Sequence, residues 1–277
     1  MDDNLRRLEN KSIFIIREVK KQFKNPAILW SMGKDSSLIL NLCKKAFYGT
    51  IPFPVVHLDT GYKFPAMYKF RDKMAKKLGL KLIIHKNLEA TAKPEDKFNC
   101  CNERKTEALK QVVKKYGFDA LLVGIRRDEH GVRNKERIMS PRDKNFMWHV
   151  VKKKEGGDSP FESMQEVELD GWGLYATEFK GADHVRVHPI INWNEIDVWR
   201  YTKEEKIPVV PLYFSKKGKR YRSLGCSPCT KPVDSKANNI KKIIKELETT
   251  KVQERSGRAQ DKEEARTFEK LRAMGYM

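Results

Sequence analysis

The most constraining feature of this sequence is a regular alternation of short apolar runs with amphipathic runs between residues 26 and 125. Apolar runs bounded by turn residues predict strands, and apolar positions that recur every three or four residues predict helices. Alternation at this spacing requires right-handed crossovers, so we predict an α/β fold with a parallel sheet. Strands are expected at 26–31, 53–60, 80–86 and 118–125, and helices at 36–47, 65–79 and 103–117.

The rest of the chain is less regular. The interval at about 140–184 is rich in turn formers, and we interpret it as a long insertion over the sheet. Residues 212–277 are strongly basic and show little strand pattern, so we divide the chain into a domain at 1–211 and a basic C-terminal region at 212–277. Further helices are expected at 4–24, 194–207, 236–250 and 262–274, and one further strand at 185–193.

The chain carries a large positive charge. Its 57 Lys and Arg residues outnumber its 37 Asp and Glu residues, which gives a formal net charge of +20 over 277 residues. Such an excess favours a polyanionic partner, with nucleic acid first among the candidates. A solvated lysine-rich surface is the alternative, because many basic residues lie in helical runs such as KKLGLK and NNIKKIIKEL.

The sequence shows no sign of a membrane segment. No apolar run approaches the length of a membrane span. The N-terminal stretch MDDNLRRLENKSIFIIREV is charged and amphipathic, and it lacks the apolar centre and cleavage site of a signal peptide. We therefore expect a cytoplasmic protein with no membrane partner.

The turn after the first expected strand, SMGKDSS at 31–37, has the composition of an anion-binding site. Gly33 lets the backbone approach a ligand closely, and the amides at the start of the next helix favour negative charge. Lys34 adds a positive charge, and the serine hydroxyls add hydrogen bonds. Asp35 suggests a divalent cation or a role in ordering the amides. The spacing differs from the GxxxxGK[ST] nucleotide loop, which occurs nowhere in the chain.

This turn resembles the SGGKDS pyrophosphate loop of the ATP pyrophosphatases, the adenine nucleotide α-hydrolase-like (PP-loop) proteins. The resemblance extends along nearly the whole chain to the branch that holds the sulfate adenylyltransferase small subunits and the phosphoadenosine phosphosulfate reductases. Met32 stands where many relatives have Gly or Ile. The resemblance implies a parallel twisted sheet with helices on both faces. It rests on NPAILWSMGKDSSLIL, KAFYGTIPFPVVHLDTGYKFPAMYKFRD, KTEALKQVVKKYGFDALLVGIRRDE, KERIMSPRD, NWNEIDVWRY, IPVVPLYF, YRSLGC and ERSGR.

The resemblance also implies a reaction. ATP, bound with Mg²⁺, is cleaved between its α and β phosphates: an acceptor oxyanion attacks the α phosphorus and pyrophosphate leaves. The implied catalytic residues are Lys34, Asp35, Arg126 and Arg127. The implied ATP-binding residues are Ser31, Gly33, Lys34, Asp35, Ser36, Ser37, Asp59, Thr60, Gly61, Arg255 and Arg258.

Some of these residues have a simpler interpretation. Asp59 suits Mg²⁺ or ribose, but an Asp at a strand end is also an ordinary turn residue. Arg126 and Arg127 suit a planar oxyanion, although with the acidic residues of GIRRDE they also form a plausible surface ion network. Arg255 and Arg258 match a basic tail motif of the family, and a solvated helix end is the alternative.

Four of the five cysteines occur as two close pairs, Cys100 with Cys101 and Cys226 with Cys229. This arrangement resembles the one in assimilatory adenylylsulfate reductases, where four thiolates hold a [4Fe–4S] cluster. Four thiolates also suit tetrahedral zinc, but adjacent cysteines chelate one ion awkwardly, and this together with the resemblance to those reductases favours the cluster. Two unconnected pairs are the remaining alternative. Cys43 stands apart on an apolar helix face, where we expect a core residue.

These features favour an ATP pyrophosphatase that activates the DNA backbone for sulfur incorporation (DNA phosphorothioation), with a cysteine desulfurase and other sulfur-transfer proteins as partners. The alternative is a sulfate adenylyltransferase small subunit, with sulfate as acceptor and a GTPase large subunit as partner. An adenylylsulfate or phosphoadenylylsulfate reductase is disfavoured, because no cysteine follows Cys229 to attack sulfur. A non-enzymatic nucleic-acid-binding module is disfavoured by the intact SMGKDSS turn. We also expect a homo-oligomer.

Overall fold

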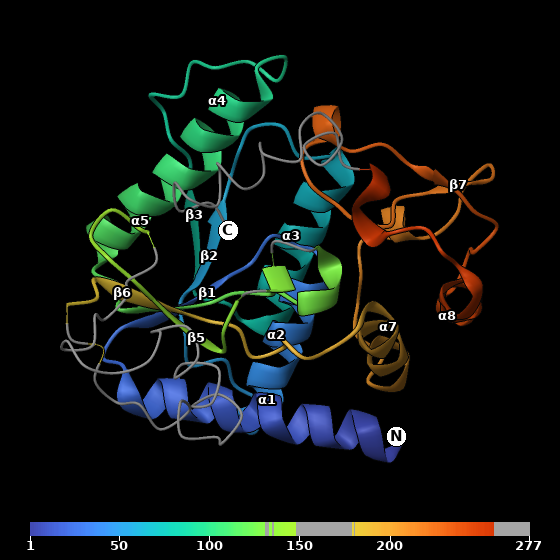
Figure 1. Ribbon diagram of the computed structural model, residues 1–277, viewed down its shortest axis with the longest axis horizontal. Helices are drawn as coiled ribbons and strands as arrows, with labels where there is room; N and C mark the ends of the chain where they lie inside the picture. Colours follow the sequence, from blue (N-terminus) through green and yellow to red (C-terminus); the bar gives the residue numbers. More distant parts are fainter. Residues whose placement is uncertain (131–132, 135, 148–178, 180, 258–277) are drawn as a thin grey trace, which may run out of the picture.

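The computed structural model describes residues 1–130, 133–134, 136–147, 179 and 181–257 (Figure 1). Its centre is a six-stranded sheet with strand order β3-β2-β1-β4-β6-β5. Neighbouring strands pair in parallel except β5, which pairs antiparallel with β6 at one edge. The strands are β1 (Pro26–Leu29), β2 (Val55–Leu58), β3 (Leu82–His85), β4 (Ala120–Leu122), β5 (Met139–Arg142) and β6 (His184–Val187), and β7 (Lys219–Arg220) and β8 (Val233–Asp234) form a separate two-stranded sheet.

Helices cover both faces of the sheet. Figure 1 shows α2 and α3 on one face and α5 on the other, while α1 packs against α2 and α8 against α7. This arrangement confirms the predicted α/β fold. The helices are α1 (Asp3–Gln22), α2 (Lys34–Ala46), α3 (Pro65–Leu78), α4 (Lys97–Cys101), α5 (Ala108–Tyr116), α7 (Glu195–Glu204) and α8 (Ile240–Thr249).

The helix ends follow from local residues. The Asp2 side chain accepts a hydrogen bond from the backbone N–H of Leu5 (2.8 Å) and so caps α1. Pro65 suits the first turn of α3, where its missing N–H leaves no partner unsatisfied. Gly79 ends α3 in the left-handed conformation, with φ 57°. Helix α2 begins at Lys34 and has no side-chain cap.

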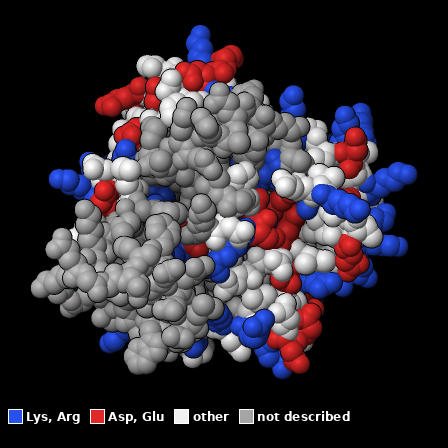
Figure 2. Space-filling model, viewed as in Figure 1, with Lys and Arg blue, Asp and Glu red and all other residues white. Residues whose placement is uncertain are grey.

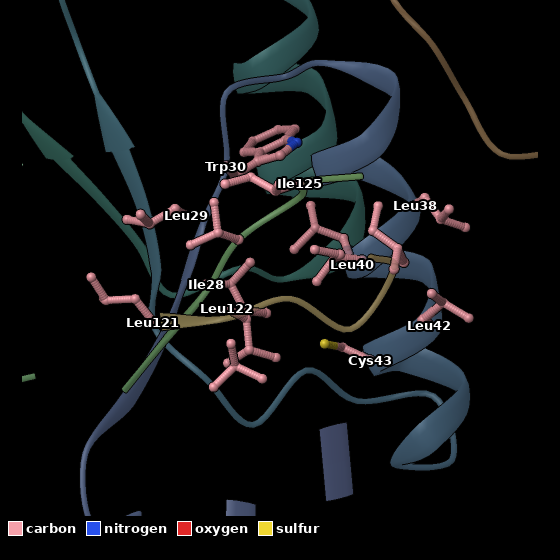
Figure 3. Close-up of a cluster of buried hydrophobic side chains, with 14 of the residues drawn as sticks. Ile28, Leu29, Trp30, Leu38, Leu40, Leu42, Cys43, Leu121, Leu122 and Ile125 are labelled. Atoms are coloured by element: carbon pink, nitrogen blue, oxygen red, sulfur yellow. The ribbon is translucent and has the colours of Figure 1, made fainter. Parts of the chain in front are cut away.

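The core joins the central strands to buried residues of α1, α2, α5 and α7. Every residue of β1, β2, β4 and β6 is buried, as expected for parallel strands covered on both faces. Figure 3 shows side chains of β1, α2 and β4 packed together, with Ile28 and Leu122 close to α2. Cys43 lies among them with no exposed surface, which confirms its assignment to the core.

Within the described residues, the structure departs from the predicted elements at β5 and at the start of α5. Strand β5 lies inside the interval predicted as an insertion, where it forms an antiparallel edge that the alternation gave no sign of. The first residues of the helix expected at 103–117 belong instead to a π-helical segment, Asn102–Glu107, which follows α4; this is a rare form that often marks functional sites. Most of the predicted insertion, Arg258 and the helix expected at 262–274 lie outside the described residues.

Candidate active site

A cavity of about 160 Å³ opens at the carboxyl edge of the sheet. Its walls include the segments that follow β1, β2 and β4, which are neighbours in the sheet. The chain passes from β1 to β2 and β3 and then returns to place β4 on the other side of β1, so the cavity lies where the strand order reverses. Tyr213, residues 223–225 and Arg255 also line it, from beyond the predicted domain boundary at 211/212.

Hydrogen bonds within the turn at 31–37 hold its shape. The Ser31 and Ser36 hydroxyls lie 3.2 Å apart, and the Ser36 hydroxyl also donates to the Gly33 carbonyl at 3.1 Å. Met32 has φ 61°, in the left-handed region that favours glycine, and its side chain is buried. Ser31, Gly33 and Ser36 line the cavity, so the structure places these three predicted ligands together.

Two residues outside the turn fix its position. A Cβ atom on Gly124 would lie 2.9 Å from the backbone nitrogen of Ser36, so only glycine lets the segment after β4 approach α2 this closely. The hydroxyl of Tyr213 accepts a hydrogen bond from the backbone N–H of Lys34 at 2.9 Å. Sequence reasoning selected neither residue, because each one acts across a large separation in the chain.

A buried ion network lies behind the turn. The Lys34 ammonium is 3.1 Å from a carboxylate oxygen of Asp35 and also contacts Glu254. The Arg126 guanidinium contacts both of these carboxylates. Lys34 and Arg126 have 1% and 0% of their side-chain surface exposed, and Glu254 has 4%. Glu254 is the first residue of the ERSGR stretch that carried part of the resemblance, but only Arg255 and Arg258 of that stretch were selected from the sequence.

The network keeps its members charged. Burial lowers the pKa of Lys34, but the carboxylates of Asp35 and Glu254 outweigh burial and raise it overall. The pKa of Arg126 is raised by the same two carboxylates, again against burial. Burial raises the pKa of Glu254, and the charges of Arg126 and Lys34 reverse this and lower it. The network therefore keeps Lys34 and Arg126 protonated and Glu254 ionised at neutral pH.

Three predicted ligands have other contacts. The Ser37 hydroxyl accepts a hydrogen bond from the indole N–H of Trp30 at 3.2 Å, and Ser37 does not line the cavity. Arg126 is enclosed by carboxylates rather than by the cavity. Arg127 contacts the amide oxygen of Asn192 and the backbone carbonyl of residue 136. The two arginines that we expected to face an oxyanion therefore lie outside the cavity wall.

Other cations line the cavity instead. Arg255, which was predicted, lies 3.2 Å from Glu129, and Arg133 contacts the same carboxylate. Burial raises the pKa of Glu129, but the charges of Arg133 and Arg255 outweigh burial and lower the pKa overall, so the group stays ionised. Lys63 and Lys105 line the same cavity, and neither was selected from the sequence. Their signal was weak because lysine is abundant along the whole chain.

The HLDTG segment forms a turn beside the cavity. Asp59 accepts hydrogen bonds from the Tyr68 hydroxyl (2.7 Å) and the Gly61 backbone N–H (2.9 Å). Burial raises the pKa of Asp59, and these two hydrogen bonds outweigh burial and lower it. Asp59 and Gly61 do not line the cavity, whereas Thr60 does, and the Thr60 hydroxyl lies 3.2 Å from the sulfur of Cys226. The contacts of Asp59 are those of a turn residue.

The four paired cysteines line one small second pocket. All of them are buried, and the Lys105 ammonium donates to the sulfur of Cys101 at 3.5 Å. Thr60 and Lys105 border both this pocket and the main cavity, so the two spaces adjoin. The pocket is lined by Thr60, Tyr62, Pro94, Cys100, Cys101, Arg104, Lys105, Cys226, Pro228 and Cys229.

The thiols influence one another without forming a compact ligand set. Burial, followed by the neighbouring thiols of Cys101 and Cys226, raises the pKa of Cys100 to about 11. All five cysteines lie in the described part of the chain, and none of them forms a disulfide. Across residues 1–130, 133–134, 136–147, 179 and 181–257, no three His, Cys, Asp or Glu side chains are grouped closely enough to hold a metal ion.

Comparison with known proteins shows the family of this chain. Residues 25–232 match the phosphoadenosine phosphosulfate reductase domain. The chain belongs to this family. Over 99% of its length it is 40% identical to the sulfate adenylyltransferase subunit 2 of Marinomonas sp. (strain MWYL1), covering 97% of that protein. It is 39% identical to the subunit 2 of Azotobacter vinelandii, with 99% and 98% covered. As a member of the family, the chain is a nucleotide-using enzyme of the PP-loop type.

Solved structures agree with this fold. The Candida glabrata FMN adenylyltransferase, in complex with FAD and inorganic pyrophosphate, matches 84% of this chain and 68% of its own, with a TM-score of 0.57 and 16% identity. Yeast FAD synthetase matches 93% and 92%, with a TM-score of 0.52 and 14% identity. At such low identity the likeness concerns the fold alone. Among the helices of the described segments, none is long and apolar enough to span a membrane.

Proposed function

We propose that this family member is the nucleotide-binding subunit of a sulfate adenylyltransferase, which uses ATP and sulfate to make adenylylsulfate and pyrophosphate. The observation that carries the proposal is the match to sulfate adenylyltransferase subunit 2 proteins over 99% of the chain. It favours the alternative that the sequence left open over our first interpretation, activation of DNA. A large-subunit partner follows from the same match, and we expect a GTPase.

The lining of the cavity suits such a reaction. Leu29, Val56 and Ile125 give one part of it an apolar lining that fits an adenine ring, and the turn at 31–37 gives another part polar groups for phosphate. A sulfate oxygen would attack the α phosphorus while the bond to the bridging oxygen breaks. The electron pair leaves with pyrophosphate. Amides and hydroxyls of the turn would stabilise the charge that develops on this leaving group.

Mg²⁺ would enter with the nucleotide. The phosphates of ATP supply most of its ligands in such sites, and the protein adds one or two carboxylates at most. Asp35 lines the cavity and is the residue best placed to assist, although its oxygens contact Lys34 and Arg126. Mg²⁺ would neutralise part of the triphosphate charge, while the turn orients the α phosphorus.

The test is a paired assay. The chain, combined with a GTPase large subunit of the same family, should release pyrophosphate and form adenylylsulfate only when sulfate, ATP and Mg²⁺ are all present. The same mixture with Lys34→Ala should do neither. Release of pyrophosphate that sulfate does not stimulate would contradict the proposed acceptor. Absence of ATP binding would contradict the proposed site altogether.

We further propose that Cys100, Cys101, Cys226 and Cys229 hold a [4Fe–4S] cluster. Four buried thiols line one pocket and provide a suitable donor set, although they would have to move closer together to bind the cluster. Such a cluster would link α4 to the 226–229 segment and place charge beside the ATP cavity. Protein purified without oxygen should be brown and contain four iron and four sulfide per chain, by analogy with Cys₄ clusters. Zinc without iron would contradict this assignment.

Activation of DNA remains a second candidate because of two observations, the net charge of +20 and the cysteine pocket. In that case the acceptor would be a backbone phosphate, and a cysteine desulfurase would supply sulfur. A direct comparison decides between the acceptors. Incubation with ATP and either sulfate or duplex DNA should yield adenylylsulfate in the first case only. Pyrophosphate release that depends on DNA would reverse this conclusion. The expected cytoplasmic location and homo-oligomeric state stay predictions.

A further inference from the structure

The segment after α8 brings one carboxylate to the cations of the proposed pyrophosphate site. One oxygen of Glu254 contacts the Lys34 ammonium, and the other contacts the Arg126 guanidinium. A phosphate group offers oxygens that a lysine and an arginine bind in the same way. Glu254 therefore makes the contacts that a phosphate of ATP would make with these two side chains.

The cations have little capacity for a further anion while Glu254 is present. Lys34 also contacts Asp35, at 3.1 Å. Arg126 also contacts Asp35, and its Nε lies 3.0 Å from Asp128. Neither side chain has more than 1% of its surface exposed. Because two anions avoid a shared low-dielectric site, pyrophosphate and Glu254 compete for the same two partners.

The structure leaves room for Glu254 to withdraw. A cavity of about 350 Å³ adjoins it, lined in part by Glu254, Lys251 and Gln253. Residues 251–253 are exposed and connect α8 to Glu254, so this short arm can turn without disturbing the core. Arg222 donates a hydrogen bond to the backbone carbonyl of Val252, and this contact would anchor the arm while Glu254 moves.

The cavity of about 350 Å³ also favours the return of Glu254 to Lys34 and Arg126. Asp128, Glu129 and Glu195 line it, and Figure 2 shows acidic side chains gathered near the middle of this face, over the region where Arg127–Glu129 lies in Figure 1. A withdrawn carboxylate would meet these like charges as well as the cations Lys251 and Arg222, of which Arg222 is already paired with Glu195. Repulsion would then push Glu254 back toward Lys34 and Arg126 once the phosphate site empties.

We propose that Glu254 is an exchangeable counter-ion of the phosphate site: it holds Lys34 and Arg126 in the empty enzyme, yields them to ATP, and takes them back as pyrophosphate leaves. The inference rests on the proposed function, because it assumes that these cations bind the pyrophosphate end of ATP. It assigns Arg126 a role in the loaded site that its enclosed position in the empty site does not suggest.

The test is the affinity for inorganic pyrophosphate, measured by titration calorimetry without divalent cations. Glu254→Gln removes the competing charge and should tighten binding on the order of tenfold, about 1.4 kcal/mol. Glu248→Gln is the matched control. Glu248 lies on α8, is partly exposed and pairs with Arg200, so this variant should bind like the unchanged protein. Glu254→Asp keeps the charge, so its affinity for pyrophosphate should also stay close to that of the unchanged protein.

Hydrogen exchange of the unchanged protein gives a second measurement that does not depend on how any variant folds. Pyrophosphate should speed amide exchange in residues 250–257 and slow it in the turn at 31–37. Equal or weaker binding by a folded Glu254→Gln variant, or unaltered exchange at 250–257 in protein that binds pyrophosphate, would overturn the counter-ion role alone. Absence of pyrophosphate and ATP binding in every variant would overturn the proposed function as well.

Discussion

The phosphate turn at 31–37 and the cysteine pocket are both marked clearly in the sequence, but they form in different ways. The turn is continuous, and regular elements, β1 and α2, fix both of its ends. The pocket joins α4 to the 226–229 segment, which is irregular apart from one short 3₁₀ turn. A backbone bridge between Lys63 and Cys226 and a hydrogen bond from the Ser227 amide to the Tyr62 carbonyl (2.7 Å) tie that segment to the loop after β2.

The two sites differ in what fixes the positions of their ligands. In the turn, strand and helix set the positions of the ligands before any ligand binds, as suits a site for precise charge stabilisation. In the pocket, helix α4 and the 226–229 segment approach each other from distant parts of the chain. A bound metal would therefore contribute much of the order in the pocket, whereas ATP would contribute little to the order of the turn.

The largest effect should come from the turn. Lys34→Ala removes the one lysine of the turn, and we expect pyrophosphate release to fall by about 100-fold or more. Lys44→Ala, an exposed position on the same helix, serves as the control and should leave the rate unchanged. Circular dichroism must show that both variants are folded. An active Lys34→Ala enzyme would mean that the turn is not the phosphate site.

Substitutions in the cysteine pocket should change the metal content of the protein. Cys226→Ser should abolish bound iron, because a cluster with three thiolates and a hydroxyl is far less stable. Cys43→Ala removes a cysteine from the core and should lower the unfolding free energy while leaving the iron content unchanged. Elemental analysis and visible absorption measure both. Equal iron content in the two variants would place the metal, if any, elsewhere.

A smaller effect separates backbone packing from ligand chemistry. Gly124→Ala would force a Cβ against the Ser36 nitrogen, and we expect a loss of about 1–3 kcal/mol in unfolding free energy together with weaker ATP binding. Gly117→Ala strains a left-handed residue that has open space around it, so it should lower stability but spare ATP binding. Urea denaturation and nucleotide titration give the two quantities. Equal ATP binding in both variants would show that the turn tolerates displacement.

The smallest effect should come from the contact between the turn and the C-terminal region. Tyr213→Phe removes the acceptor for the Lys34 amide, which is worth about 1 kcal/mol. We expect KM for ATP to rise about fivefold with little change in kcat. Tyr221→Phe, which removes a hydroxyl from a ring packed against Phe64, is the control. A fall in kcat alone would assign Tyr213 to the chemical step.

The sequence predicted the sheet well because its signals are local. Apolar runs and Gly79 located β1 to β4 and the end of α3 within a few residues. The antiparallel strand β5 was missed because the pairing that defines it joins residues on either side of a long interval. The start of α5 was also missed, because the periodicity of 103–117 gave no sign that a π-helical segment would occupy its first residues.

The candidate site was predictable only in part. Composition identified the turn, and a resemblance pointed to Arg126 and Arg255. What composition does not contain is the partner of each charge. Arg126 lies in a network of carboxylates, and Glu254 completes that network from the other end of the chain. Such partners depend on how the C-terminal region folds back over the sheet edge, a long-range property that single-sequence patterns do not report.

The close approach at Gly124 has a consequence for how the protein is made. Ribosomes release the turn at 31–37 long before β4 exists, and the turn has no wall on that side until residues 120–124 arrive. The turn should therefore reach its final shape only when β4 joins β1, and Tyr213 adds a still later contact. We expect that a nascent chain that stops before β4 does not bind ATP. Only chains that have completed the sheet would then bind the nucleotide.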